Sequence, residues 1–185
     1  MFAENGYHEA LVDEIGKRTS ISKGGLYFHF PSKERLFFAV MDRLADKLVK
    51  HAEKATMCAD SPIAAAGAAL DAVVVALSKR KRLARLLVTQ GYSMGNGFES
   101  KRSEIFNRFS IIIKRRLDEA KSVGEIGDVD TDLASRIWIG AVNELVVHWL
   151  FSHGPSPSDA SVELKSQLIA SVRRPGAVLS GLKGS

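Results

Sequence analysis

Residues 21–34 read ISKGGLYFHFPSKE, and they predict a short helix, a break at Pro31 and the start of a longer helix. Leu26 and Phe30 are four residues apart, so they share one face of the short helix and can anchor it to a core. Gly24 and Gly25 are poor helix formers, each costing about 1 kcal/mol relative to alanine. Two of them within one turn indicate that the backbone must come close to something bulky.

The opposite side of the short helix carries small, basic and aromatic side chains, a combination that suits a DNA groove. The residues predicted to contact DNA are Ser22, Lys23, Gly24, Gly25, Tyr27, Phe28, His29 and Lys33. Lys23 is the candidate for base readout, whereas Tyr27 and His29 are expected to touch phosphates. Lys33 stands at the start of the longer helix, where a helix N-terminus can meet a phosphate. The plainer alternative is that all of these are solvated surface side chains.

The segment before residue 21 completes a helix–turn–helix pattern. Residues 11–18 form a helical stretch, and Thr19, Ser20 and Ile21 form the turn that follows it. The motif positions, in fixed register from residue 6 to residue 36, are Gly6-Tyr7, Ile15, Ile21-Ser22-Lys23-Gly24, Leu26-Tyr27, His29-Phe30, Ser32-Lys33-Glu34 and Leu36. This register closely resembles the DNA-binding domain of TetR-type transcriptional regulators.

Two positions depart from that family pattern. The turn usually has glycine where this chain has Ser20, which is expected to strain the turn. A helix position that often carries threonine or serine is Gly25, which removes a base or phosphate contact. The resemblance also implies a full first helix before the segment that begins at Phe2. Because Met1 falls inside that helix, we expect the protein to continue upstream.

The composition is that of an ordinary globular protein, with 185 residues of which 45% are hydrophobic and 25% charged. Cys58 is the only cysteine, which excludes an intramolecular disulfide and favours a reducing compartment. The first residues lack the features of a signal peptide. The most apolar run, residues 137–151, is interrupted by Asn143, Glu144 and His148, which argues against a membrane span. We therefore expect a cytoplasmic protein without a membrane partner.

The formal net charge of +5 permits binding to nucleic acid without requiring it. Residues 1–38 contain five Lys or Arg and five Asp or Glu, so this segment has a formal net charge of zero. DNA binding therefore depends on where the cations stand. The densest basic run is residues 79–82, followed by Arg85. A solvated junction between two helices is the favoured interpretation of this run, and attraction to DNA or to an acidic ligand headgroup is the alternative.

Helical periodicity continues along the rest of the chain without strand alternation, which predicts an all-α fold. Helices are expected at residues 32–56, 62–78, 83–88, 99–123, 131–151 and 159–173. Residues 1–38 are predicted to form a helix–turn–helix DNA-binding domain, and residues 39–185 a helical ligand-binding and dimerisation domain. The long helix at residues 32–56 would join the two, so a shift of its far end would swing the DNA-binding head.

The helix at residues 131–151 is apolar nearly all round, and such a helix must be covered on every side. Burial against a second copy is therefore expected, and the resemblance implies a homodimer with a four-helix interface built on the last two helices. The predicted interface residues are Val146, Trp149, Leu164, Leu168 and Val172. The predicted ligand pocket consists of Met94, Phe98, Phe106, Phe109, Trp138, Glu144 and His148. Each apolar member of that pocket is also explained as an ordinary core residue.

Glu144 and His148 are four residues apart on one helix face, and His153 follows them. A metal site or an acid–base pair could be drawn from them, but no companion motif supports it. Buried polar pairs more often satisfy each other's hydrogen bonds. We therefore expect neither an enzyme nor a metal site nor a cofactor.

Together these patterns predict a ligand-responsive transcriptional regulator, most simply a repressor. It would bind a palindromic double-stranded operator as a homodimer and be released by a small, mostly apolar effector. The C-terminal half also resembles a TetR subgroup that responds to fatty acyl derivatives. One alternative is a helical small-molecule-binding protein that has lost DNA binding, and another is a small helical enzyme.

Overall fold

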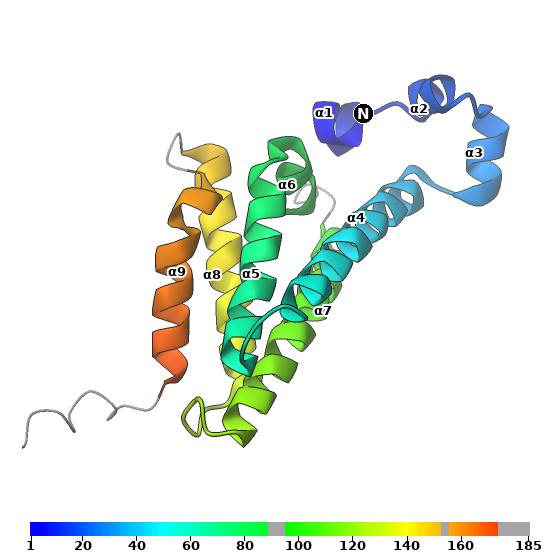
Figure 1. Ribbon diagram of the computed structural model, residues 1–185. Coiled ribbons are helices and arrows are strands. Elements are labelled where there is room, and N and C mark those ends of the chain that lie inside the picture. The colour runs from blue at the N-terminus through cyan, green and yellow to red at the C-terminus, as the bar shows by residue number, and fades with distance from the viewer. Residues whose placement is uncertain (89–94, 153–155, 174–185) are drawn as a thin grey trace, which may run out of the picture.

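The computed structural model describes residues 1–88, 95–152 and 156–173, and all regular secondary structure in these ranges is helical, as predicted (Figure 1). The helices are α1 (Phe2–Glu9), α2 (Val12–Thr19), α3 (Lys23–His29), α4 (Lys33–Thr56), α5 (Pro62–Ser78), α6 (Lys81–Val88), α7 (Asn96–Ser122), α8 (Thr131–Phe151) and α9 (Pro157–Val172). Helices α1–α3 form a small head at one end of α4, and α5–α9 form a body around its other end. The predicted domain boundary after residue 38 falls inside α4, which is continuous.

Serine side chains begin the two helices that follow the helix–turn–helix turn. Ser22 caps α3, because its Oγ accepts a hydrogen bond of 3.0 Å from the backbone N–H of Gly25. Ser32 caps α4 in the same way, with 3.1 Å to the N–H of Arg35. Each such cap satisfies one of the free N–H groups of a helix N-terminus and contributes about 1 kcal/mol.

The turn between α2 and α3 is tight, and it depends on Gly16 and Ser20. Ser20 has left-handed backbone angles, with φ 58° and ψ 28°, so the strain expected of a non-glycine residue is present there. The chain then returns so closely that Ile21 N–H donates to the Gly16 carbonyl at 3.0 Å. A Cβ at Gly16 would lie 2.7 Å from the Ile21 carbonyl oxygen, so only glycine fits.

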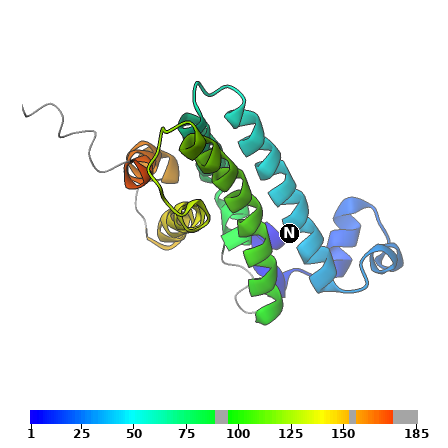
Figure 2. The same cartoon turned by 90° about the horizontal axis from the view of Figure 1, so that it is seen from below.

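Helix α5 is the centre of the body and contacts α4, α6, α7, α8 and α9 (Figures 1 and 2). Its buried residues include Ala65, Ala66, Gly67 and Ala69, which let neighbouring helices approach closely. A Cβ on Gly67 would meet the Lys165 side chain of α9 at 2.9 Å, so α9 lies directly against this glycine. Lys165 also pairs with Asp71 one turn further along α5.

Helices α4 and α7 run side by side and are joined by a row of charged contacts (Figure 2). Lys101 pairs with Asp42 at 3.1 Å, and Arg108 pairs with Asp46. Near the far end of α4, Arg116 donates to the Thr56 hydroxyl at 2.9 Å. The acidic side of α4 is therefore neutralised by the basic residues of α7.

Aromatic packing fixes the head on α4. The ring of Phe37, which is fully buried, lies 5.1 Å from the rings of both Phe2 and Tyr7 in edge-to-face geometry. A second connection links the head to the body, because Glu4 of α1 pairs with Arg18 of α2 at 2.9 Å and with Arg82 of α6 at 3.2 Å.

Within the described ranges, no single helix has the length and hydropathy needed to cross a membrane. The pair α5 and α6 reaches them only when taken together, across a bend of 111°.

The left-handed conformation of Ser20 generates a stability prediction. Replacing Ser20 with glycine removes the steric cost of that conformation, partly offset by the larger entropy of glycine in the unfolded chain. We expect Ser20→Gly to raise the free energy of unfolding by about 0.5–1 kcal/mol, measured by urea denaturation. The matched control is Ser166→Gly on the exposed face of α9, which should lower the free energy of unfolding by about 0.5 kcal/mol. Destabilisation by Ser20→Gly would show that the turn is not strained.

Candidate nucleic-acid interface and ligand cavity

The outer surface of α3 presents polar and aromatic side chains at the tip of the head. All the predicted DNA-contact residues on α3 are exposed except Gly25, which is partly covered by Ile21 and Ser22. Phe28 is 84% exposed and Tyr27 is 40% exposed, while Leu26 on the opposite face is buried. This arrangement agrees with the predicted division of the helix into an anchoring face and a free face.

Lys23 is held over α2 by Asp13. Its Nζ lies 2.9 Å from Asp13 Oδ1, and both side chains are more than half exposed. The hydrogen bond to the Asp13 carboxylate, followed by its charge, raises the pKa of Lys23 above its ordinary value. Lys23 is therefore a permanently charged donor whose present partner is an exposed carboxylate that a nucleic acid could displace.

Lys33 has a structural role that the sequence pattern did not predict. Its Nζ donates to the His8 carbonyl at 2.8 Å and stands 4.8 Å from the centre of the Tyr7 ring. The ammonium of Lys33 thus links the C-terminal end of α1 to the first turn of α4. An ammonium has three donors, so this contact leaves others for a phosphate.

Two small adjoining cavities lie in the body between α4, α5, α7 and α8. The larger, here called the inner cavity, has a volume of about 40 Å³, and its neighbour has about 20 Å³. Both are lined by Val73, Phe109, Ile139 and Val142. All residues that line the inner cavity are apolar except Asn143, so an apolar ligand fits it.

The predicted pocket residues are only partly brought together. Phe106 and Phe109 both line the inner cavity. Phe98 and Trp138 are buried elsewhere in the core and line neither cavity. The prediction is wrong for Glu144 and His148, which are exposed because they lie on the face of α8 that points away from α5 and α7. Met94 and His153 lie outside the described residues.

Asn143 is a cavity residue that the sequence analysis missed. It lines the inner cavity, and its side-chain Oδ1 is buried without a hydrogen-bond partner in the described part of the chain. A buried, unpaired amide oxygen costs about 1–3 kcal/mol unless a guest satisfies it. The sequence contains one signal for it, a polar residue within a helix that is otherwise apolar, but that signal was used above only to argue against a membrane span.

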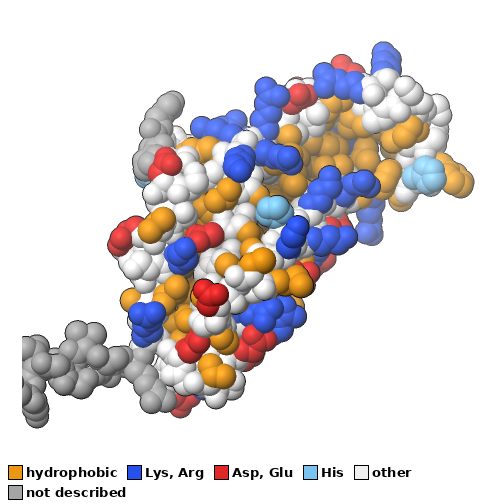
Figure 3. Space-filling view, viewed as in Figure 1, with side chains coloured by type: hydrophobic (Ala, Val, Ile, Leu, Met, Phe, Trp, Pro, Cys, Tyr) orange, Lys and Arg blue, Asp and Glu red, His pale blue; other side chains and the backbone are white. Residues whose placement is uncertain are grey.

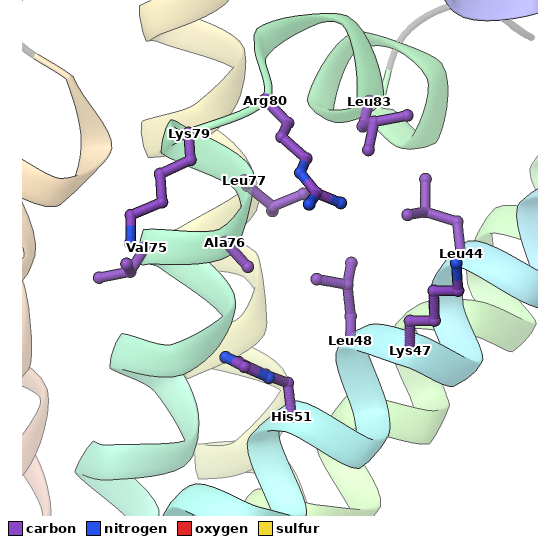
Figure 4. Close-up of a pocket in the computed structure, with 10 residues that line it drawn as sticks. All are labelled: Leu44, Lys47, Leu48, His51, Val75, Ala76, Leu77, Lys79, Arg80 and Leu83. Atoms are coloured by element: carbon purple, nitrogen blue, oxygen red, sulfur yellow. The ribbon is translucent and has the colours of Figure 1, made fainter.

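A larger depression opens on the surface between α4, α5 and the start of α6, and is called the outer groove (Figures 3 and 4). Its volume is about 250 Å³. It is lined by Leu44, Lys47, Leu48, His51, Val75, Ala76, Leu77, Lys79, Arg80 and Leu83. Figure 3 shows basic side chains gathered around this part of the surface. The basic run at residues 79–82 therefore contributes to a concave surface as well as to a helix junction.

The residues predicted for the dimer interface do not lie on the surface as expected. Val146, Leu168 and Val172 are 0%, 7% and 2% exposed, so they belong to the chain's own core and that assignment is wrong. Trp149 and Leu164 are partly buried against the same core. Helix α9 turns this stripe toward α5 because Lys165 and Ile169 pack over Gly67.

In the described ranges, no three His, Cys, Asp or Glu side chains lie close enough together to hold a metal ion. Cys58 is exposed beyond the end of α4.

Comparisons with known proteins agree with the fold and with the head. Residues 1–40 match the family model described as "Bacterial regulatory proteins, tetR family". The fatty acid metabolism regulator protein of Bacillus subtilis is 25% identical over 160 residues, which is 82% of this chain and 79% of the relative. The HTH-type transcriptional activator FasR of Mycolicibacterium smegmatis is 46% identical over 55 residues, which is 30% of this chain but only 25% of FasR.

A solved structure extends the likeness to the whole fold. The transcriptional regulator FadR from Bacillus subtilis, in complex with stearoyl-CoA, superposes with a TM-score of 0.83 at 21% sequence identity. The superposition covers 93% of this chain and 94% of that chain. The helix–turn–helix head, the shared fold and the family match lead to one conclusion. Residues 1–40 carry the DNA-binding domain of the tetR family of bacterial regulatory proteins, and the whole chain shares the fold of the FadR structure.

Proposed function

We propose that this protein is a transcriptional repressor that binds a palindromic operator as a homodimer and leaves it when an acyl-chain effector enters the body. The observation that carries the DNA-binding part is the exposed face of α3, where Tyr27 is exposed and the partner of Lys23 is an exposed carboxylate that a phosphate or a base can replace. A helix of this kind enters the major groove, and a dimer presents two of them to successive grooves.

The acyl class of effector is supported by the lining of the inner cavity, which is apolar except for Asn143. The comparisons point the same way, since a Bacillus subtilis relative is named for fatty acid metabolism and the FadR structure from that organism was solved with stearoyl-CoA. A cavity of about 40 Å³ has room for no more than a few water molecules, since one water needs about 10–15 Å³ of such space. The cavity must therefore widen to admit an acyl chain, and widening moves the helices that line it.

The route from cavity to head runs through α4 and α6. Leu48 of α4, together with Leu87 and Val88 of α6, lines the inner cavity. Helix α4 carries the head directly, and α6 holds α1 through the pair between Arg82 and Glu4. An effector that separates α4 from α6 favours a second arrangement of the head, and so shifts the population away from the DNA-binding state.

The proposal is tested by selecting operators from a random-sequence duplex library with the purified protein. We expect enrichment of a palindrome whose half-sites are one helical turn apart, about 34–36 Å. The selected duplex, labelled for fluorescence anisotropy, should then be released by dodecanoyl-CoA. A library that shows no enrichment would favour the alternative, a helical small-molecule-binding protein without DNA binding. Enrichment without release would retain the DNA-binding part and remove the acyl effector.

Lys23 provides a residue-level prediction on the selected duplex. Replacing Lys23 with alanine should weaken binding by about 1–3 kcal/mol, because one direct contact to a base or a phosphate is lost. The matched control is Lys54→Ala, which removes the same charge from the exposed far end of α4. Anisotropy titrations at constant salt should separate the two variants. Equal losses in both would mean that bulk charge, rather than contact at α3, determines the affinity.

For the homodimer, we propose that the interface consists of the exposed apolar side chains of the last two helices. These are Leu133, Ile137 and Phe151 of α8 and Val162 of α9, each more than half exposed. Gly140, on the same exposed face of α8, has nothing within 4 Å of an added Cβ. Glycine inside an exposed helix lowers its stability by about 1 kcal/mol relative to alanine. At an interface, its small size allows the backbone of a second helix to approach closely.

The dimer prediction uses two isoleucines of similar exposure. Ile137→Glu should convert the dimer to monomer at micromolar concentration, because two unpaired carboxylates would be buried at the interface. Ile111→Glu, at a residue that is 58% exposed on α7, should remain dimeric. Sedimentation velocity distinguishes these outcomes. A dimeric Ile137→Glu protein would place the interface elsewhere.

A further inference from the structure

The outer groove combines an apolar floor with a positively charged rim. Leu48 and Leu77 form part of the floor and are 7% and 6% exposed. The rim carries Lys47, Lys79 and Arg80. No lining residue is acidic, so the groove has three formal positive charges and no compensating carboxylate.

The rim cations have no partner among the ion pairs of the described residues. Lys47, Lys79 and Arg80 are absent from those pairs, although Asp42 and Asp46 stand on the same helix as Lys47. Those two carboxylates face α7, where Lys101 and Arg108 neutralise them. Helix α4 therefore separates its charges, with carboxylates toward α7 and Lys47 at the outer groove.

Arg80 is held in place by its backbone. Its N–H donates to the Leu77 carbonyl at 3.0 Å, and its carbonyl accepts from the N–H of Ala84 at 3.0 Å. In Figure 4 its side chain points from the turn between α5 and α6 into the groove, on the side of Leu48. His51 projects from α4 toward α5 below it. The guanidinium offers several donors in a fixed plane, which suits phosphate and carboxylate oxygens.

The outer groove and the inner cavity have two lining residues in common. Leu48 of α4 and Leu77 of α5 line both of them. On one side of this pair lies the charged rim, and on the other lies the apolar lining with Asn143. A molecule with an anionic head and an apolar chain matches this order of surfaces.

We infer that the outer groove binds the anionic head of the effector, while the chain passes between Leu48 and Leu77 into the inner cavity. This inference rests on the proposed acyl effector and assigns its anionic head to the outer groove and its acyl chain to the inner cavity. Arg80 and Lys47 bind the head, and the two leucines separate to admit the chain. Head binding then places one ligand in contact with both the α5–α6 turn and α4. Helix α4 carries the DNA-binding head, and α6, which follows the turn, pairs with it through Arg82 and Glu4.

The experiment measures the affinity of four probes by calorimetry at fixed ionic strength: dodecanoyl-CoA, dodecanoate, methyl dodecanoate and CoA alone. In the double variant Lys47→Gln/Arg80→Gln, the Kd for dodecanoyl-CoA should rise by about tenfold or more, as expected for loss of charge-assisted hydrogen bonds. The Kd for methyl dodecanoate, which has no charge, should change by less than about twofold. Comparing the changes for dodecanoate and dodecanoyl-CoA separates a carboxylate head from a phosphate head.

The control double variant is Arg43→Gln/Lys54→Gln, which removes two exposed charges of α4 outside the groove. It should leave the affinity for dodecanoyl-CoA within about twofold, because exposed charges further away are screened by salt. An equal loss in the control variant would overturn the inference in favour of general electrostatic attraction. A Lys47→Gln/Arg80→Gln protein that loses operator affinity without ligand, and binds dodecanoyl-CoA normally, would assign the rim to the DNA backbone instead.

A cavity-filling variant tests the path of the chain. Val73 lines the inner cavity but not the outer groove, so Val73→Phe should weaken dodecanoyl-CoA and methyl dodecanoate together while binding of CoA alone is unchanged. Thermal melting checks that the variant is folded. Unchanged dodecanoyl-CoA affinity in this variant would overturn the proposed path.

If the unaltered protein binds no acyl probe, both the proposed acyl effector and the proposed site for its anionic head are wrong. If the unaltered protein binds dodecanoyl-CoA and the groove variants bind equally well, only the head site fails.

Discussion

The close approach of five helices to α5 is the constraint on which the rest of the structure depends. Alanine and glycine along α5 set the distance to α9, and any larger side chain at Gly67 would push Lys165 and Ile169 outward. The same helix supplies Val73 and Leu77 to the inner cavity and ends at the turn that carries Arg80. Because interiors are close-packed, a guest cannot enter beside α5 without displacing a neighbouring helix. The ligand cavity and the stability of the body are therefore properties of one packing arrangement.

The head is attached to this body in ways that differ in strength. Phe37 packs against Phe2 and Tyr7 in a buried aromatic contact, which makes the head and the first turns of α4 one unit. The connection from α6 to α1 combines helix packing with an ion pair between Arg82 and Glu4, whose side chains are 73% and 38% exposed. Exposed pairs contribute little to stability, about 0–1 kcal/mol. A modest ligand-binding energy is therefore enough to break this ion pair, whereas the buried aromatic contact needs much more.

Local signals in the sequence were sufficient for the helices and for the helix–turn–helix unit. Ser32, Pro62 and Asp130 mark helix starts, and the bounds of the helices at residues 62–78 and 131–151 agree with the prediction. It was harder to predict which side of a helix faces the core, because α8 and α9 each carry more than one apolar stripe. The contact of α9 with Gly67, far away in sequence, decides that Leu168 is core and Val162 is surface. Helical periodicity contains no information on which apolar stripe faces the core.

The unpaired oxygen of Asn143 and the hydrogen bond from Lys33 to the His8 carbonyl were also beyond sequence reasoning, because they depend on how distant segments pack.

The ion pairs inside the head have a consequence for how such a regulator would find its operator. Lys23 is matched by Asp13 and Arg18 by Glu4, and the formal charge of residues 1–38 sums to zero. Few counterions are released when a neutral surface meets arbitrary DNA, so sequence-independent affinity stays low. A regulator with such a head would spend little time sliding along the chromosome and would remain largely in free solution between encounters. If the protein works as proposed, occupancy of its operator would follow the number of ligand-free dimers, with little competition from the vast excess of other sites.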